Sequence, residues 1–133
     1  MNIAVCIDDN GGMLFNSRRQ SRDRILIEDF LRTAGNNKVF VRSFSEKLFV
    51  DINVSVNDNC LSDAEENDFC FIEDESILPF SEKIKTLIIY KWNRVYPADF
   101  SFEMPEGFKL SEAYEFQGSS HEKITKEIYV NEN

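Results

Sequence analysis

The chain has 133 residues, of which 42% are hydrophobic, and its formal net charge is −9. This length predicts one domain over residues 1–133, and the acidic balance argues against nucleic acid and anionic membranes as partners, because both bind basic surfaces. We expect a cytoplasmic protein for three reasons. The three cysteines (Cys6, Cys60 and Cys70) lack C-x-x-C spacing, the sequence has no signal-peptide pattern, and it has no apolar run of transmembrane length.

The first third of the chain predicts a strand followed by a helix. Ile3–Ile7 is an almost continuous apolar run before a turn-forming Asp-Asp-Asn-Gly-Gly segment, which is typical of a strand buried on both faces. A polar, arginine-rich loop leads to Ser21, which we expect to cap a helix with Asp23 in its first turn. Apolar residues recur at helical spacing up to Gly35, which is expected to end the helix.

The rest of the chain alternates predicted strands with short helices and polar loops. Expected strands are Lys38–Val41, Ile52–Val56, Phe69–Ile72 and Thr86–Tyr90. A short helix is expected from Ser43, which with Glu46 has the spacing of a capping box. Phe108–Phe116 and Ile124–Val130 are typical of an antiparallel hairpin. This order predicts a single α/β domain: a mostly parallel sheet with flanking helices and a C-terminal antiparallel hairpin.

Four segments carry a resemblance to a known family: Ile3–Met13, Asp23–Leu31, Lys38–Phe44 and Tyr96–Phe100. Together with the order of the elements they resemble a shortened, divergent dihydrofolate reductase. In that family, the segment that Ile3–Met13 resembles is the first strand with its mobile loop, and the segment that Asp23–Leu31 resembles is the helix with the substrate-binding carboxylate. The segment that Lys38–Phe44 resembles is the strand and helix start that meet the cofactor phosphates. The resemblance implies a dihydrofolate reductase-like fold, a substrate-binding role for Asp23, and a cofactor-binding role for Arg42 and Ser43.

Two departures from the reductases concern the cofactor. The family has paired glycines after the strand that resembles Phe69–Ile72, which let the backbone approach the pyrophosphate of NADPH, whereas this chain has Glu73-Asp74-Glu75 there. Three carboxylates repel a pyrophosphate and crowd the backbone. The Leu-Pro-Trp that precedes the family's first helix is also absent, and Arg18-Arg19-Gln20 stands near that place. We therefore expect a domain without a competent standard NADPH site.

The whole chain is also similar to a set of short bacterial proteins, some of which carry a ribonuclease Z label. Asp8–Asn16, Trp92–Asp99 and His121–Glu127 carry this similarity. Ribonuclease Z itself resembles the metallo-β-lactamases and needs a cluster of histidines around two zinc ions. This chain has one histidine, so its residues do not support the label.

The strongest candidate site is the loop Asp9–Asp23, because ligands of open α/β sheets bind at the carboxyl ends of strands. Arg18 and Arg19, with amides at a helix start, suit a phosphate or carboxylate; the alternative is that these arginines pair with surface acids. Asp23 either accepts hydrogen bonds from the ligand or is a structural first-turn carboxylate.

Residues late in the chain extend this candidate site. Trp92, Arg94 and Tyr96 alternate along the chain, so they are expected to stack a flat ligand, to form a partner surface, or to pack over the sheet edge. His121 is expected to be exposed or to have a capping role, because the sequence places no nucleophile or metal ligand beside it.

These patterns leave four hypotheses about function. The first is a domain that binds a small anionic or nucleotide-like molecule between the Asp9–Asp23 loop, the first helix and Trp92–Asp99. The others are a divergent NADPH-dependent reductase that uses Arg42 and Ser43, a metal-dependent nuclease that uses aspartates such as Asp8, and an interaction module whose partner is another protein or a second copy of the chain. The sequence assigns no cofactor, no metal and no catalytic residue.

Overall fold

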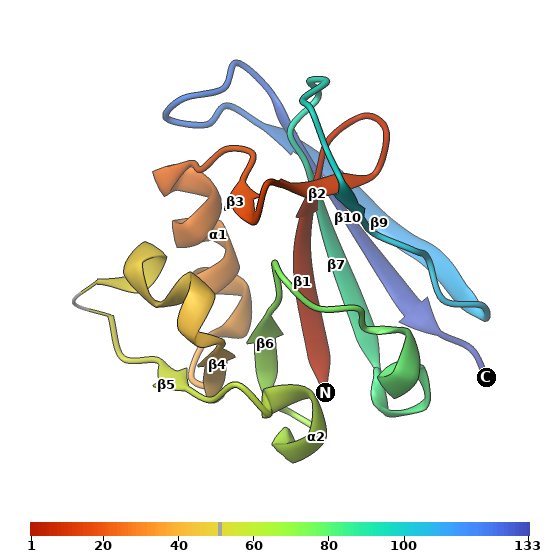
Figure 1. Ribbon diagram of the computed structural model, residues 1–133. Coiled ribbons are helices and arrows are strands. Elements are labelled where there is room, and N and C mark those ends of the chain that lie inside the picture. Colours follow the sequence, from red (N-terminus) through yellow and green to blue (C-terminus); the bar gives the residue numbers. More distant parts are fainter. Residues whose placement is uncertain (51) are drawn as a thin grey trace.

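The computed structural model describes residues 1–50 and 52–133, and a seven-stranded sheet runs through it (Figure 1). The strands lie in the order β5 (Ser55–Val56), β4 (Val39–Val41), β6 (Phe69–Phe71), β1 (Asn2–Ile7), β7 (Thr86–Lys91), β10 (Ile124–Asn131) and β9 (Phe108–Phe116). The strands from β5 to β7 are parallel, and β10 and β9 add an antiparallel hairpin beside β7. The predicted α/β fold class, with a mostly parallel sheet and a C-terminal hairpin, is confirmed.

Strand β1 lies at the centre of the sheet and is buried on both faces. All six of its residues are buried, and it pairs with β6 on one side and β7 on the other. Its side chains alternate between two cores, with Ile3, Val5 and Ile7 on one face and Ala4 and Cys6 on the other. This two-sided burial explains why the strand is a continuous apolar run.

Helix α1 (Arg24–Ala34) covers the face of the sheet to which Ala4 and Cys6 point (Figure 1). The helix begins at Arg24 because its N-cap is Asp23, with φ −152° and ψ 125°, so the predicted cap at Ser21 is wrong. Gly35 ends the helix as predicted, with a positive φ of 59° that glycine adopts without strain.

The arginine-rich loop after β1 contains a small sheet that the sequence pattern did not reveal. β2 (Gly12–Phe15) pairs with β3 (Arg18–Arg19) and with β8 (Phe100–Ser101). Asn16 and Ser17 join β2 to β3 with φ values of 52° and 59°, the signature of a type I′ hairpin turn. Buried residues of β2 belong to the core on the side of the sheet away from α1, so this hairpin is anchored and presents its arginines from a fixed backbone.

Three short helical segments complete the described structure: η1 (Ser43–Phe49), α2 (Cys60–Asp63) and η2 (Leu78–Lys83). The predicted capping box of η1 is wrong, because no side chain caps this 3₁₀-helix and Ser43 Oγ instead donates to Asp58 Oδ2 at 2.9 Å. The predicted strand over residues 52–56 is shorter than expected, since only Ser55–Val56 pairs with β4. No helix in residues 1–50 and 52–133 is long and apolar enough to cross a membrane.

Phe30 of α1 is expected to be a sensitive core position. It is 0% exposed, and its ring centroid lies between 5.3 and 6.3 Å from those of Phe49, Phe69 and Phe71. Phe30→Ala should lower the free energy of unfolding by about 3–5 kcal/mol, because it removes buried contacts and leaves a cavity. Urea denaturation measures the loss. Phe15→Ala, at a position 41% exposed, is the control and should cost about 1 kcal/mol or less; equal losses in the two variants would contradict this core.

Candidate functional site

Polar side chains gather where the parallel strands end. Asp8 follows β1, Arg42 follows β4, Glu73 follows β6, and Trp92 follows β7. Ligands of open α/β sheets bind at this edge. The partners of these side chains therefore decide which part of the edge is free to receive a ligand.

Arg19 and Glu73 occupy one part of this edge by pairing with each other. The guanidinium donates to both carboxylate oxygens, with Nη2 2.6 Å from Oε1 and Nε 2.8 Å from Oε2. Ser45 Oγ donates to the same Oε1 at 2.7 Å, and Glu73 is only 8% exposed. The hydrogen bonds to Glu73 raise the pKa of Arg19 above its usual range. An anion that binds Arg19 would have to displace a buried carboxylate.

Arg42 and Ser43, the predicted cofactor-binding residues, are engaged in the same way. Arg42 Nε lies 2.9 Å from Asp74 Oδ1, and the guanidinium also pairs with Glu75 and donates to the carbonyl oxygen of Asp58. The backbone amide of Ser43 donates to Asp58 Oδ1 at 2.8 Å. Two of the acidic residues that follow β6, Asp74 and Glu75, are thus the partners of the arginine predicted to hold a phosphate.

The Asp23 carboxylate is the most heavily hydrogen-bonded group in the site. Its side chain is fully buried and accepts hydrogen bonds from four backbone amides, those of Ile25, Leu26, Ser119 and Ser120, at distances between 2.8 and 3.2 Å. His121 Nδ1 lies 2.9 Å from its Oδ2. Burial works to raise the pKa of Asp23, but these hydrogen bonds, His121 first among them, outweigh burial and hold the pKa well below its usual range.

Gly118 lets the loop before β10 close around this carboxylate. A Cβ placed at Gly118 would lie 2.3 Å from Asp23 Oδ2, well inside van der Waals contact, while the Gly118 amide donates to the carbonyl of His121 at 2.9 Å. A glycine is needed here for close approach.

His121 is buried, with 5% of its surface exposed, so of its two expected roles the exposed one is wrong. Its contact with the N-cap residue Asp23 agrees with the capping role. Its Nε2 lies 2.9 Å from Ser21 Oγ and 3.4 Å from Tyr96 Oη. The imidazole also stacks on Trp92, with the ring centroids 4.7 Å apart and the planes at 28°. Five residues from three distant parts of the chain (21–23, 92–96 and 121) therefore form one polar cluster, which we call the His121 cluster.

The predicted ligand-binding residues separate into three groups in the structure. Asp23, Trp92 and Tyr96 meet in the His121 cluster, where Trp92 is 4% exposed. Arg18 and Arg19 lie together on β3. Arg94 is exposed, and its carbonyl accepts a hydrogen bond from the amide of Asp9. The alternation of Trp92, Arg94 and Tyr96 does not put Arg94 beside the other two, because the extended strand ends at Lys91 and Asn93 has a positive φ of 60°.

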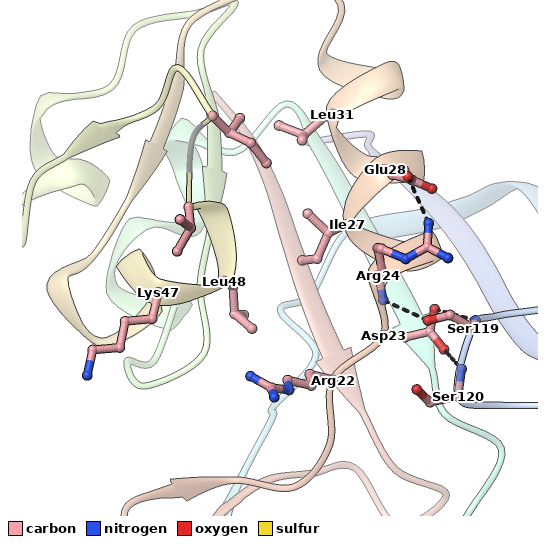
Figure 2. A pocket seen from close by; sticks show the side chains of 12 residues that line it. Arg22, Asp23, Arg24, Ile27, Glu28, Leu31, Lys47, Leu48, Ser119 and Ser120 are labelled. Carbon is pink, nitrogen blue, oxygen red and sulfur yellow. Dashed lines mark hydrogen bonds and ion pairs between the residues drawn. The ribbon is translucent and has the colours of Figure 1, made fainter.

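A cleft of about 500 Å³ opens beside this cluster, between α1, η1 and residues 119–120 (Figure 2). Ile27 and Leu31 extend from α1 toward η1, which carries Leu48. These apolar side chains line the interior of the cleft. The sequence pattern gave no sign of it, because α1 and η1 meet only in the folded chain.

Basic side chains also line the cleft. They are Arg22, Arg24 and Lys47. Arg24 pairs with Glu28 at 3.2 Å across an exposed turn of α1, but within residues 1–50 and 52–133 neither Arg22 nor Lys47 has an ion-pair partner. Within the described residues, the cleft therefore combines apolar walls with two basic side chains that have no ion-pair partner.

A second hollow, of about 460 Å³, lies on the other side of Arg22. It is lined by Ser17, Arg18, Arg19, Ser21, Arg22 and Phe44. Arg18 is exposed there, and Ser21 is half-buried with its hydroxyl on His121. We call this space the Arg18 hollow.

The aspartates of the nuclease hypothesis are not gathered around a common point. Asp8 accepts hydrogen bonds from the amides of Asn10, Gly12 and Tyr96 and from the Gln20 side chain. Burial works to raise the pKa of Asp8, but these hydrogen bonds prevail and lower it. In the described part of the chain, no group of three or more His, Cys, Asp or Glu residues is arranged to hold a metal ion.

Neither a family model nor a curated protein matches this sequence. The structure is similar to the dihydrofolate reductase from Enterococcus faecalis, complexed with NADP(H) and RAB-propyl, with a TM-score of 0.72 over 99% of this chain and 96% of that chain. The chain has a dihydrofolate reductase-like fold. The sequences are 10% identical, so the likeness of this dihydrofolate reductase-like domain lies in the path of its backbone. The resemblance that the sequence suggested is confirmed for the fold.

Gly118→Ala should destabilise the domain by about 1–3 kcal/mol, because the added methyl group collides with the Asp23 carboxylate. Urea denaturation followed by circular dichroism measures the change. Ser120→Ala is the matched control, since Ser120 binds Asp23 through its amide and its exposed side chain takes no part. A Gly118→Ala protein as stable as Ser120→Ala would mean that the loop does not close on Asp23.

Asp23 should also make the domain sensitive to acid. Its pKa is lower in the folded than in the unfolded chain, so the carboxylate stabilises the fold above the unfolded pKa of about 4. This stabilisation is lost as the pH falls from about 5 toward the folded pKa. Asp23→Asn should cost about 2–4 kcal/mol at pH 7, because a neutral amide caps the helix and binds His121 less well. Urea denaturation between pH 7 and pH 2 should give a shallower decline for Asp23→Asn; parallel curves would contradict this role.

Proposed function

We propose that this domain binds a small anionic or nucleotide-like molecule, that the cleft between α1 and η1 receives it, and that the domain has no competent standard NADPH site. The observation that carries the proposal is the cleft itself. A volume of about 500 Å³ suits a small ligand. Its apolar side chains, Ile27, Leu31 and Leu48, suit a ring or hydrocarbon body.

The charges around the cleft support an anionic ligand. Arg22 lies on the loop before α1 and Lys47 on η1, from which its side chain extends away from α1 (Figure 2). Neither has an ion-pair partner within the described residues. A guanidinium binds a phosphate or carboxylate through two parallel hydrogen bonds. The ligand therefore carries its negative group at the Arg22 end of the cleft and its apolar part against α1.

Of the arginines predicted to meet the ligand, Arg18 is the better placed. It lines the hollow that shares Arg22 with the cleft, so a ligand with a second anionic group reaches it from the cleft. Arg19 binds Glu73 in two hydrogen bonds and has less to gain from a ligand. Asp23 lines the cleft itself. Trp92 and Tyr96 act through the His121 cluster, which Asp23 joins to the cleft, and Arg94 is left for the approach of the ligand from solvent.

Two observations support the loss of the standard NADPH site. Glu73, Asp74 and Glu75 stand where reductases have glycines, and the pairing of Arg42 with Asp74 and Glu75 removes a cation that a phosphate needs. The similar solved structure is a reductase complexed with NADP(H), and we do not assign NADP(H) binding to this chain. For the compartment we keep the cytoplasm as a proposal, since all three cysteines are free and buried.

A thermal-shift titration with AMP, ADP, folic acid and NADPH tests the proposal. AMP, ADP or folic acid should stabilise the protein saturably, by about 2.7 kcal/mol at a hundredfold excess over Kd, and NADPH should not. Arg22→Ala and Lys47→Ala should each weaken binding about tenfold by calorimetry, because each removes a charge-assisted contact. Arg32→Ala is the matched control, since Arg32 is an exposed arginine of α1 outside the cleft.

Each contrary result points to a different hypothesis. Saturable stabilisation by NADPH would restore the reductase hypothesis and overturn the loss of its site. Equal affinities in Arg22→Ala and Arg32→Ala would remove the cleft as the binding site. No stabilisation by any of the four compounds would contradict the ligand-binding function and favour a protein-interaction module.

A further inference from the structure

We infer that Ser21, His121 and Asp23 form a serine-nucleophile triad, and that the Arg18 hollow is the site where it transfers the acyl group of a small anionic ester to water. The inference rests on one juxtaposition. A hydroxyl, an imidazole and a carboxylate that lie up to 100 positions apart in the chain form a continuous line of hydrogen bonds that ends at a solvent-open hollow.

The geometry is that of an activated hydroxyl. Ser21 Oγ lies 2.9 Å from His121 Nε2, and His121 Nδ1 lies 2.9 Å from Asp23 Oδ2. Asp23 already accepts four amide hydrogen bonds, so it is held as a carboxylate, and an ionised carboxylate requires a proton on Nδ1. Nε2 is then left as the acceptor for the Ser21 hydroxyl. This is the arrangement in which a serine becomes a nucleophile.

The imidazole is fixed on more sides than a helix cap requires. Trp92 stacks against one face of the ring, Tyr96 Oη lies 3.4 Å from Nε2, and only 5% of the residue is exposed. Asp23 acts here as a positioning residue, since it fixes the tautomer and the direction of the ring. A rigid base keeps the proton acceptor within hydrogen-bond reach of the nucleophile.

The hollow supplies access and a preference for charge. It has a volume of about 460 Å³, and Ser21 lines it together with Arg18 and Arg22. No described residue accepts a hydrogen bond from the backbone amides of Ser21 or Arg22, and we assign these two amides to the oxygen that becomes negative in acyl transfer. The two arginines favour a substrate whose acid part carries a carboxylate or phosphate.

The reaction needs only the ester and water. Ser21 Oγ forms a bond to the carbonyl carbon while its proton moves to His121 Nε2. The ester C–O bond then breaks, and the leaving alkoxide takes the proton from Nε2 as an alcohol. Water attacks the acyl-serine, gives one proton to Nε2, and releases the acid, after which Nε2 returns the proton to Ser21 Oγ. No oxidant, reductant or metal takes part.

This activity does not depend on the proposed ligand of the cleft: the two spaces share Arg22, but Ser21 lines only the Arg18 hollow, and its reaction needs no ligand in the cleft. The two proposals therefore fail separately. The cleft can lack affinity for every compound tested above while Ser21 still reacts, and Ser21 can be inert while the cleft binds its ligand.

The first test is covalent labelling with a fluorophosphonate, in which Ser21 Oγ displaces fluoride from phosphorus. Peptide mapping by mass spectrometry should find the adduct on Ser21, with none in Ser21→Ala and an unchanged rate in Ser111→Ala, an exposed serine of β9. His121→Gln should lower the rate about a hundredfold or more. No adduct on Ser21 in the folded protein, or an equal rate in folded His121→Gln, would overturn the triad.

A second variant keeps the test valid if His121→Gln fails to fold. Ser21→Cys leaves the histidine in place, and the thiol at position 21 should be alkylated by iodoacetamide at least about tenfold faster than the thiol of Ser111→Cys, because an adjacent imidazole stabilises a thiolate. The three native cysteines are buried and do not compete. An equal or slower reaction at position 21 would show that His121 does not activate that position.

The positioning role of Asp23 and the charge of the substrate have their own measurements. Asp23→Asn, labelled well below its melting temperature, should react more slowly than wild type; a purely structural Asp23 would lower the melting temperature and leave this rate unchanged. Mono-p-nitrophenyl succinate should be hydrolysed with a higher kcat/KM than p-nitrophenyl acetate, and Arg18→Ala should remove that difference. Equal kcat/KM for both esters in the wild type would overturn the anionic substrate class.

Discussion

The carboxylate of Asp23 joins the parts of the chain that build the site. It caps α1 through the amides of Ile25 and Leu26, and it holds the loop before β10 through two further amides and the His121 side chain. Buried and surrounded by donors, it stays ionised, and that charge fixes the start of the helix and the end of the hairpin relative to each other. Asp23 lines the cleft and belongs to the His121 cluster, and Ser21 of that cluster lines the Arg18 hollow.

Charge is divided unequally along the ligand edge of the sheet. On the side of β4 and β6, Arg19 and Arg42 are matched by Glu73, Asp74 and Glu75, so that side stabilises the fold and offers little to an anion. On the side of α1 and η1, Arg24 pairs with Glu28, and Arg22 and Lys47 have no ion-pair partner among the described residues. The ends of β4 and β6 thus form a neutralised region of this dihydrofolate reductase-like fold, and the cleft between α1 and η1 carries Arg22, Arg24 and Lys47.

Elements whose sequence signals lie close together in the chain were predicted correctly. Five apolar residues in a row predicted β1, helical spacing predicted α1, and Gly35 predicted the end of α1, because each signal depends on residues that are close together in the chain. The predictions that failed depended on partners far away. The Ser21 side chain is able to cap a helix, but Asp23 is the N-cap residue. Its carboxylate also accepts hydrogen bonds from donors in residues 119–121, which lie far along the chain. The sequence did not predict the turn at Asn16-Ser17, because this pair lacks the glycine of the Asn-Gly and Asp-Gly pairs that mark two-residue hairpins.

By itself the sequence determined the fold class, the central strand, the covering helix and the hairpin, because the spacing of apolar residues along the chain decides which segments form strands or helices and which of their faces are buried. It also showed that Glu73, Asp74 and Glu75 follow the strand after which the dihydrofolate reductases have paired glycines. Only the tertiary structure decided that Arg19 and Arg42 are paired with those acids, that a cleft opens between α1 and η1, and that His121 lies between Ser21 and Asp23. Hydrogen bonds and ion pairs act over about 3 Å, and the distances between residues far apart in the chain are fixed only when the sheet brings their strands together.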